Sequence, residues 1–183
     1  SAEAQARKPE AVQDFRRILD DKNVDALIIG AGSHWGPLAT IMACQAGKDV
    51  YVEKPFSHNV SEGRKAVEAA RKYQRIVQVG SQNRSGEYIR NAISRIRGGE
   101  LGKVHFVRVL NMLNEVRGLP GPYPGEAVPP EVDYDMWCGP APKRAYNSNK
   151  TVPGKWRYFW DYSGSDSESI HQLDIGRWVV GQE

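Results

Sequence analysis

The sequence has few cysteines and no long apolar run, and each shortage excludes a class of protein. Its two cysteines, Cys44 and Cys138, lie far apart and match no metal-binding spacing. We therefore expect no disulfide framework, and the scarcity of cysteine favours a reducing compartment. Apolar runs such as residues 26–29 fall far short of the ~20 residues of a membrane span. Residues 1–7 also lack the apolar core of a signal peptide.

Charge of one sign is not concentrated anywhere in the chain. The formal net charge is +3, and in stretches such as residues 62–72 basic and acidic side chains alternate. This alternation is typical of a solvated helix face, so we expect neither a nucleic-acid partner nor a membrane partner. A cytoplasmic location is favoured, with an exported form as the alternative, because the sequence does not begin with methionine.

Apolar spacing predicts alternating helices and strands. Apolar residues at helical spacing predict five helices: 10–21, 37–46, 61–73, 88–97 and 171–180. Short apolar runs between turn residues predict four strands: 25–29, 49–53, 76–79 and 104–110. Ser61 is the expected cap of the third helix, and Cys44 is an expected core residue.

The order of these elements predicts the fold class. Strand and helix alternate from residue 10 to about residue 80, which favours βαβ units and a parallel sheet with helices on both faces. We therefore expect an α/β protein with a doubly wound parallel sheet. Residues 111–155 are rich in proline, glycine and asparagine and show no period. So long a connection is usually functional or wraps another domain.

Three glycines after the first predicted strand imitate a nucleotide-binding fingerprint. Gly30 and Gly32 follow the strand, Gly36 opens a helix, and Glu53 ends the next strand about twenty residues on. In that fingerprint the glycines let a pyrophosphate approach a helix N-terminus. The spacing here is looser, and the side chains at positions 34 and 35 are bulky. A tight strand-to-helix turn is the favoured interpretation.

Lys54 stands at the end of a predicted parallel strand, where such sheets bind ligands. Pro55 fixes the backbone after it and cannot continue the strand. A lysine held there, partly desolvated, can take part in proton transfer. An exposed lysine after a strand is the alternative for an isolated Glu-Lys-Pro sequence.

The longer context of Lys54 resembles a known family. Residues 46–55 are similar to a segment of the glucose–fructose oxidoreductase, inositol dehydrogenase and rhizopine-catabolism family, written Gfo/Idh/MocA. Further segments resemble this family in the same order: 14–26, 33–35, 77–84, 101–104, 133–142, 160–162 and 171–174. The resemblance places the turn at 30–36 after the family's fourth strand. It thus implies that the first strand, the phosphate loop and the ribose-binding acid lie outside this chain.

The resemblance also implies how the chain is organised. Residues 1–84 are expected to form a partial NAD(P)-binding Rossmann domain, and residues 85–183 the start of an α+β domain for substrate binding and oligomerisation. The family's second domain normally continues well beyond residue 183, so the chain is interpreted as an internal fragment. The full-length protein is expected to be a homo-oligomer.

The activity that the resemblance implies is hydride transfer between nicotinamide C4 of NAD or NADP and a hydroxyl carbon of a sugar or polyol, the expected small-molecule partner. A histidine ionises near neutrality, and His171 is the implied general base. Lys54 is expected to hydrogen-bond the same oxygen and stabilise its developing charge. The residues implied to contact the cofactor are His34, Trp35, Glu53, Lys54, Pro55 and Arg84.

Side chains on the substrate side are less clearly marked. Arg157 and Tyr162 are the candidates from an aromatic-rich run over 156–162, whose rings suit sugar stacking. The alternative is that most of these rings anchor a long loop to the core. Asp166 is a third candidate. No residue is expected to bind a metal.

Departures from the family pattern keep other functions open. Ser167 and Ser169 occupy places where the family usually has an acid or amide and a glycine, and Asp166 is the candidate replacement for the acid. Gly36 stands where a second histidine is common. One alternative is a non-catalytic sugar-binding or assembly protein on the same fold. Another is an NAD-assisted glycoside hydrolase that works by transient oxidation.

Overall fold

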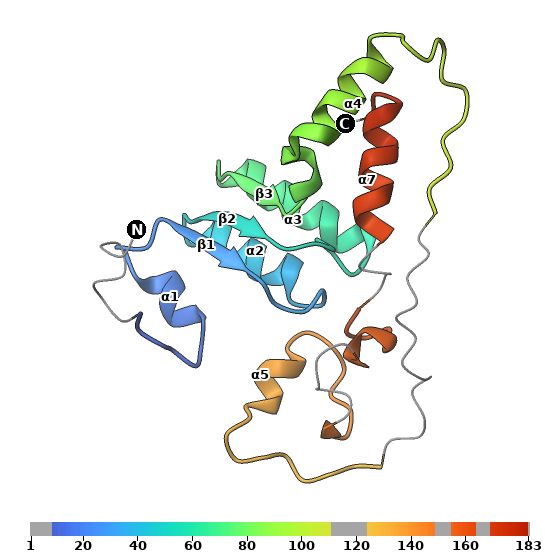
Figure 1. Cartoon of the computed structure of the whole chain (residues 1–183). Helices are drawn as coiled ribbons and strands as arrows, with labels where there is room; N and C mark the ends of the chain where they lie inside the picture. Colours follow the sequence, from blue (N-terminus) through green and yellow to red (C-terminus); the bar gives the residue numbers. More distant parts are fainter. Residues whose placement is uncertain (1–8, 111–123, 149–154, 164–168, 183) are drawn as a thin grey trace.

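A three-stranded parallel sheet forms the centre of the first part of the chain. The computed structural model describes residues 9–110, 124–148, 155–163 and 169–182. The strands, in their order across the sheet, are β1 (Ala26–Ile29), β2 (Asp49–Val52) and β3 (Val77–Val79). Because both pairings are parallel, the carboxyl ends of the three strands meet at one edge of the sheet (Figure 1). The predicted α/β class is confirmed.

Two helices connect the strands and cover one face of the sheet. α2 (Gly36–Gln45) joins β1 to β2, and α3 (Val60–Lys72) joins β2 to β3. The two helices contact each other and bury small side chains, which allows close packing. On the other face Ile28 is 84% exposed. The predicted second layer of helices is therefore not found among the described residues, because none of them packs on Ile28.

The core lies between this sheet and its two helices. Six buried side chains form one cluster: Leu19, Ile29, Ala39, Ala43, Val50 and Val52. Cys44 is fully buried beside them, as expected, and burial raises the pKa of its thiol. Strand residues that alternate inward and helix residues spaced by four positions supply this cluster, which follows from the two side-chain periods.

The cap of α3 differs from the expected one. Asn59, not Ser61, precedes the helix in an extended conformation, and its side-chain oxygen accepts a hydrogen bond from the Glu62 backbone N–H at 2.9 Å. The Asn59 amide also donates to the Glu62 carboxylate at 2.8 Å. Asn59 is thus the side-chain cap of α3, which satisfies one free N–H of the first turn. The predicted cap was wrong because Ser61 already lies inside the helix.

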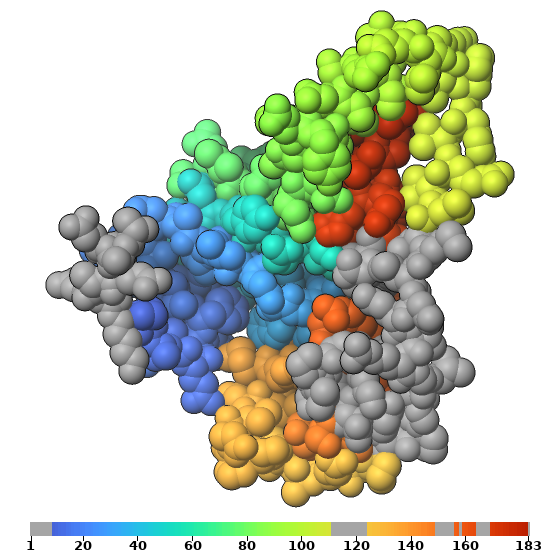
Figure 2. All heavy atoms as spheres, viewed as in Figure 1, coloured from blue at the N-terminus to red at the C-terminus, as the bar shows by residue number. Residues whose placement is uncertain are grey.

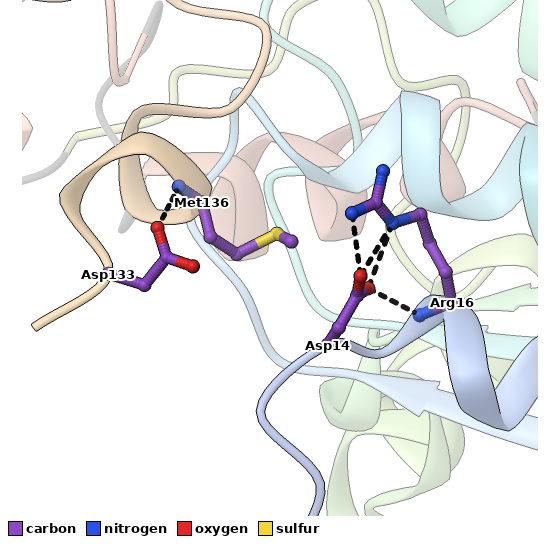
Figure 3. A network of polar contacts seen from close by, with 4 residues as sticks. All are labelled: Asp14, Arg16, Asp133 and Met136. Atoms are coloured by element: carbon purple, nitrogen blue, oxygen red, sulfur yellow. Dashed lines mark hydrogen bonds and ion pairs between the residues drawn. The ribbon is translucent and has the colours of Figure 1, made fainter.

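Two short helices start close to each other at one edge of the molecule. α1 (Arg16–Asp20) is shorter than the predicted 10–21, because the Asp14 carboxylate binds the Arg16 backbone N–H and guanidinium before the helix begins. α5 (Tyr134–Cys138) is capped by Asp133, which accepts from the Met136 N–H at 2.9 Å. Figure 3 shows the contacts of Asp14 with Arg16 and of Asp133 with the Met136 N–H in one view. The charge of Asp133 helps to raise the pKa of Arg16, after the larger effect of Asp14.

The last elements form a separate layer beside the sheet. A 3₁₀ turn η2 (Gln82–Ser85) leads into α4 (Glu87–Arg97), which packs against α7 (Ser169–Val179) (Figure 1). A second 3₁₀ turn, η3 (Lys155–Tyr158), precedes α7. In the space-filling view, residues 124–148 lie directly against the blue residues of the first part of the chain (Figure 2).

The predicted strand at 104–110 is an extended segment without strand pairing. Val107 and Val109 face Gly176 of α7, while Phe106 and Leu110 are exposed. The alternation that predicted a strand is therefore real. A strand also needs a neighbour to hydrogen-bond with, and no described residue provides one for this segment.

Candidate active site

A cavity of about 230 Å³ lies at the carboxyl ends of β1 and β2. Two turns and one short helix line it: residues 30–33 after β1, residues 53–55 after β2, and Trp156 and Arg157 of η3. Ligands of open α/β sheets bind at this edge. The volume is below the ~300 Å³ at which pockets begin to bury a drug-sized ligand, so the cavity suits a single ring such as nicotinamide or a sugar.

Lys54 is carried into the cavity by the end of β2. The Glu53 backbone N–H still donates to Ile29 of β1 at 2.9 Å, so the strand stays fixed to its last residue. The Lys54 backbone N–H then turns toward the Glu53 carboxylate at 3.3 Å. Lys54 and Pro55 both line the cavity, as the sequence predicts for the end of this strand.

The position of the Glu53 side chain depends on Gly80, the residue after β3. A Cβ added at Gly80 would lie 3.1 Å from the Glu53 carboxylate and 3.0 Å from the Tyr51 hydroxyl. The Gly80 backbone N–H donates to Val52 at 2.8 Å, which extends the pairing of β2 and β3 by one residue. Glycine at position 80 therefore leaves the space in which the Glu53 carboxylate sits.

The glycines of the turn at 30–36 have different surroundings. A Cβ at Gly32 would lie 2.7 Å from the His34 ring, and a Cβ at Gly36 would lie 2.8 Å from the Phe56 carbonyl oxygen. Nothing lies within 4 Å of a Cβ at Gly30, which lines the cavity. Two of the three glycines thus make room for the protein's own atoms. This supports the interpretation of residues 30–36 as a tight turn rather than as a phosphate-binding loop.

His34 is a buried link between two parts of the chain. The side chain is 7% exposed, and its Nδ1 and Nε2 lie 3.1 Å and 3.0 Å from the carbonyl oxygens of Tyr162 and Trp137. A neutral imidazole can donate to one of these carbonyls and an imidazolium to both. The sequence predicts a cofactor contact, but His34 is not among the described residues that line the cavity.

Trp35 plays a similar structural part. Its indole N–H donates to the Met136 carbonyl at 2.9 Å, and its ring packs edge-on against Phe15 with centroids 5.5 Å apart. Gly139 makes room for the indole, since a Cβ there would lie 2.2 Å from the ring. Trp35 is also predicted to contact the cofactor, and the structure places it against α5 instead.

Tyr162 belongs to a buried aromatic cluster rather than to the cavity. It is 0% exposed, its hydroxyl donates to the Pro142 carbonyl at 3.4 Å, and its ring lies 4.7 Å from that of Trp137. Burial raises the pKa of Tyr162, and that of its neighbour Tyr134. Tyr162 is not among the described residues that line the cavity, and it fits the alternative in which these rings anchor a loop; its predicted substrate contact stays a prediction.

Arg157 is the substrate-side candidate that the structure brings to the cavity. Its guanidinium carbon lies 5.0 Å above the Trp156 ring, a distance typical of a cation–π contact. Trp156 and Ser33 also line the cavity, and neither was named among the predicted site residues, although both lie in segments that the sequence singles out, 156–162 and 33–35. Ser33 could have been found by its place in the turn after β1. Asp166 lies outside the described residues.

His171 and Arg84 lie together, away from the described lining of the cavity. Arg84 donates through Nε and Nη2 to the two carboxylate oxygens of Asp174, at 2.7 Å and 2.8 Å. Asp174 follows His171 by one turn of α7. The sequence predicts a cofactor contact for Arg84, whereas the structure gives its guanidinium a carboxylate partner. Lys54 and His171 are not brought into one cavity by the described residues, so their predicted pairing stays a prediction.

Two other findings bear on the class of site. Among the described residues no group of three or more histidine, cysteine, aspartate or glutamate side chains is arranged to hold a metal ion. Within the same residues no helix is both long enough and apolar enough to cross a membrane.

Comparisons with known proteins identify both parts of the chain. Residues 1–81 match the family described as "Oxidoreductase family, NAD-binding Rossmann fold", and residues 121–183 match "Oxidoreductase family, C-terminal alpha/beta domain". The chain is 22% identical over 174 residues to a myo-inositol 2-dehydrogenase of Thermotoga maritima, with 95% of this chain and 41% of that protein covered. It is 33% identical over 91 residues to a scyllo-inositol 2-dehydrogenase (NAD(+)) of Bacillus subtilis, covering 50% and 27%.

Further relatives show how much of a whole protein this chain spans. An uncharacterised oxidoreductase of Bacillus subtilis is 25% identical over 170 residues, which cover 93% of this chain and 39% of that protein. A solved myo-inositol 2-dehydrogenase of Lactobacillus plantarum has a TM-score of 0.48 and 28% identity, covering 51% of this chain and 28% of that one. The chain therefore spans about two fifths of the length of the Thermotoga maritima dehydrogenase and of the uncharacterised Bacillus subtilis oxidoreductase.

Proposed function

We propose, since the chain belongs to the Gfo/Idh/MocA oxidoreductase family, that its protein transfers a hydride between NAD or NADP and a hydroxyl-bearing carbon of a sugar or polyol. The observation that carries the proposal is Lys54, held at the end of β2 in a ring-sized cavity on the ligand-binding edge of the sheet. Two of the relatives above are named as inositol dehydrogenases, which favours a cyclic polyol or sugar.

The cavity fits the reactive end of a nicotinamide nucleotide. Its volume of about 230 Å³ takes one ring, and Gly30 leaves its wall open where a side chain would intrude. The residues that would hold this end are Gly30, Ser33, Glu53 and Pro55. When bound, the nicotinamide accepts or donates the hydride. The adenosine end needs residues other than those that line this cavity.

The protein's own contribution is to hold and polarise the reacting oxygen. Lys54 would donate a hydrogen bond from its ammonium group to the substrate oxygen, which gains negative charge as its proton leaves. A group in place before the reaction avoids the cost of reorienting solvent. His171 would take the hydroxyl proton, a role that requires α7 to face the edge where Lys54 lies. Trp156 narrows the cavity over Gly32, where its ring lies 3.7 Å from a Cβ position, and so limits access of water.

Arg157 is the proposed substrate-orienting residue. Its stem and guanidinium lie at the cavity wall beside Trp156, and five N–H donors in a fork suit a pair of hydroxyl oxygens. The guanidinium is planar, and its contact with the Trp156 ring restricts where its donors lie, which favours one orientation of the sugar ring.

The domain boundary at 84/85, the homo-oligomer and the cytoplasmic location remain predictions.

The first experiment measures binding of NAD(H) and NADP(H) by calorimetry. It compares this chain with a chain extended at both ends to the length of the curated relatives. Binding by either chain supports the proposal, and Lys54→Ala is then expected to lower kcat with a polyol by about 10²- to 10³-fold, as for loss of one preorganised donor. Lys22→Ala is the matched control, because Lys22 is exposed on the other side of β1 from the cavity. If neither chain binds NAD(H) or NADP(H), the proposal that the protein is an oxidoreductase is overturned.

A non-catalytic sugar-binding protein is the second candidate. The observation that favours it is that four predicted site residues are occupied by contacts within the protein: His34, Trp35, Arg84 and Tyr162. On this alternative, titration with a sugar produces a binding signal while neither nicotinamide nucleotide does.

A further inference from the structure

Arg84 and Asp174 form a two-point ion pair between η2 and α7. The two bonds of 2.7 Å and 2.8 Å join Nε and Nη2 of one guanidinium to both oxygens of one carboxylate. Such a two-point bond fixes orientation as well as distance, which a single charge contact does not. The side chains are 33% and 22% exposed, so solvent screens the pair only in part.

A third side chain completes the contact on α7. The guanidinium carbon of Arg84 lies 5.2 Å from the centre of the Trp178 ring. Asp174 and Trp178 are four residues apart, so they occupy the same face of the helix, and His171 lies one turn earlier on that face. The residue expected to act as base therefore belongs to the stripe that Arg84 holds.

Arg84 is itself fixed to the edge of the sheet that bears Lys54. The η2 turn starts at Gln82, soon after the end of β3, and the Arg84 backbone N–H donates to the Ser81 carbonyl at 3.0 Å. The Gly80 backbone N–H, four residues before Arg84, donates to Val52 of β2 at 2.8 Å, and Lys54 follows Val52 after one residue. Residues 80–84 therefore connect the end of β2 to α7, through the Gly80–Val52 bond at one end and the Arg84–Asp174 pair at the other.

We propose that Arg84 and Asp174 are positioning residues that set the rotation of α7 and so aim His171 at the carboxyl edge of the sheet. The inference rests on the proposed function, because His171 has a task there only if the protein transfers hydride. It assigns Arg84 to the helix and not to the cofactor. A cofactor contact by Arg84 would leave Asp174 without influence on the reaction.

The test uses the protein from its complete gene and three variants of the pair: Arg84→Gln, Asp174→Asn and Arg84→Lys. Arg177→Gln is the matched control, an exposed arginine of the same helix. We expect Arg84→Gln and Asp174→Asn to lower kcat by about 10- to 100-fold with less than a twofold change in the dissociation constant of NAD(H). Arg84→Lys keeps the charge but loses the fork, so it is expected to restore only part of kcat.

A double-mutant cycle separates positioning from general loss of structure. In a His171→Ala background, Asp174→Asn should lower the residual kcat by less than twofold, because there is no base left to aim. If Asp174→Asn lowers turnover equally with and without His171, the pair is only structural and the inference is overturned. A tenfold weaker binding of NAD(H) in Arg84→Gln but not in Asp174→Asn would also overturn it.

A second readout does not depend on turnover. The sequence has four histidines, so the His171 ring signal in a proton–carbon NMR spectrum can be assigned by its loss in His171→Ala. We expect that signal to shift or broaden in Arg84→Gln and Asp174→Asn and to stay in place in Arg177→Gln. If it stays in place in all variants, the inference fails even where hydride transfer is confirmed. If it moves while no polyol is oxidised, the positioning contact stands and the proposed function fails.

Discussion

Residues 9–85 are joined by repeated contacts between neighbouring elements, whereas residues 124–182 contact them through a few individual side chains. In the first part, strand pairs and the α2–α3 contact distribute the cohesion over many residues. Between the parts, His34 reaches carbonyls 103 and 128 residues away, and Arg84 reaches a carboxylate 90 residues away. The difference predicts that loss of one tether should destabilise the second part more than the sheet.

His34→Ala is expected to have the largest effect on the stability of the second part relative to the first. It removes the partner of two buried carbonyl groups and leaves a cavity, so we expect a loss of about 3 to 4 kcal/mol for residues 124–163. Urea unfolding followed by tryptophan fluorescence should move to lower urea concentration, while far-ultraviolet circular dichroism of the sheet moves less. His105→Ala, at an exposed position, is the control. Coincident transitions for both probes would contradict a separable second part.

Gly36→Ala and Gly30→Ala form a matched pair within the first part. A Cβ at Gly36 would press on the Phe56 backbone carbonyl, which cannot move aside as a side chain can, so we expect a loss of about 2 kcal/mol. A Cβ at Gly30 meets no atom within 4 Å, so its free energy of unfolding should stay within about 0.5 kcal/mol. Because Gly30 lines the cavity, its variant should instead weaken NAD(H) binding. If Gly30→Ala lowered the stability and Gly36→Ala weakened NAD(H) binding instead, the roles given to these two glycines would be contradicted.

Asn59→Ala tests the cohesion of the first part alone. It removes the side chain that caps α3 through the Glu62 backbone N–H, at an expected cost of about 1 kcal/mol. Ser61→Ala is the control, since Ser61 lies inside the helix and is not its cap. Thermal unfolding of the two variants compares them directly, and an equal loss from both would restore Ser61 as the cap.

Tyr134→Phe and high pH test the second part with the smallest expected effect. Burial raises the pKa of Tyr134 and Tyr162, so the folded state favours their neutral forms. Their stabilisation is complete below the unfolded pKa of about 10 and is lost as the pH rises above it. Tyr134→Phe should unfold as the parent does at pH 7 and lose less stability between pH 9 and 11. An unchanged alkaline profile would show that Tyr134 does not contribute to it.

The first part could be predicted from sequence because its signals are local. Apolar spacing and glycines at the ends of elements lie within a few residues of the elements they indicate. They predict the strands at 26–29 and 49–52 and the helix at 36–45. The position of Lys54 also follows, because a residue after a parallel strand must lie at the ligand-binding edge. The family resemblance adds the cofactor class, which no local spacing in this chain provides.

The rest could not be predicted because it depends on distant partners. Tyr162 and Trp156 lie in the same aromatic run, and only the fold decides that one is buried and the other lines the cavity. The alternation over 104–110 is correct for a strand, but pairing requires a neighbour that spacing does not identify. Arg84 suits an anionic ligand as well as a carboxylate of the protein, and the choice is made by the position of α7.

The absence of a side chain at Gly80 has a consequence for which substitutions this position can tolerate. A Cβ there would meet the ends of Tyr51 and Glu53, which are flexible enough to move aside at little cost in stability. Their movement would nevertheless shift the carboxylate at the wall of the cavity. A library of variants at position 80 sorted for solubility should therefore keep alanine and serine, while one sorted for turnover should return glycine. Position 80 thus separates selection for folding from selection for chemistry.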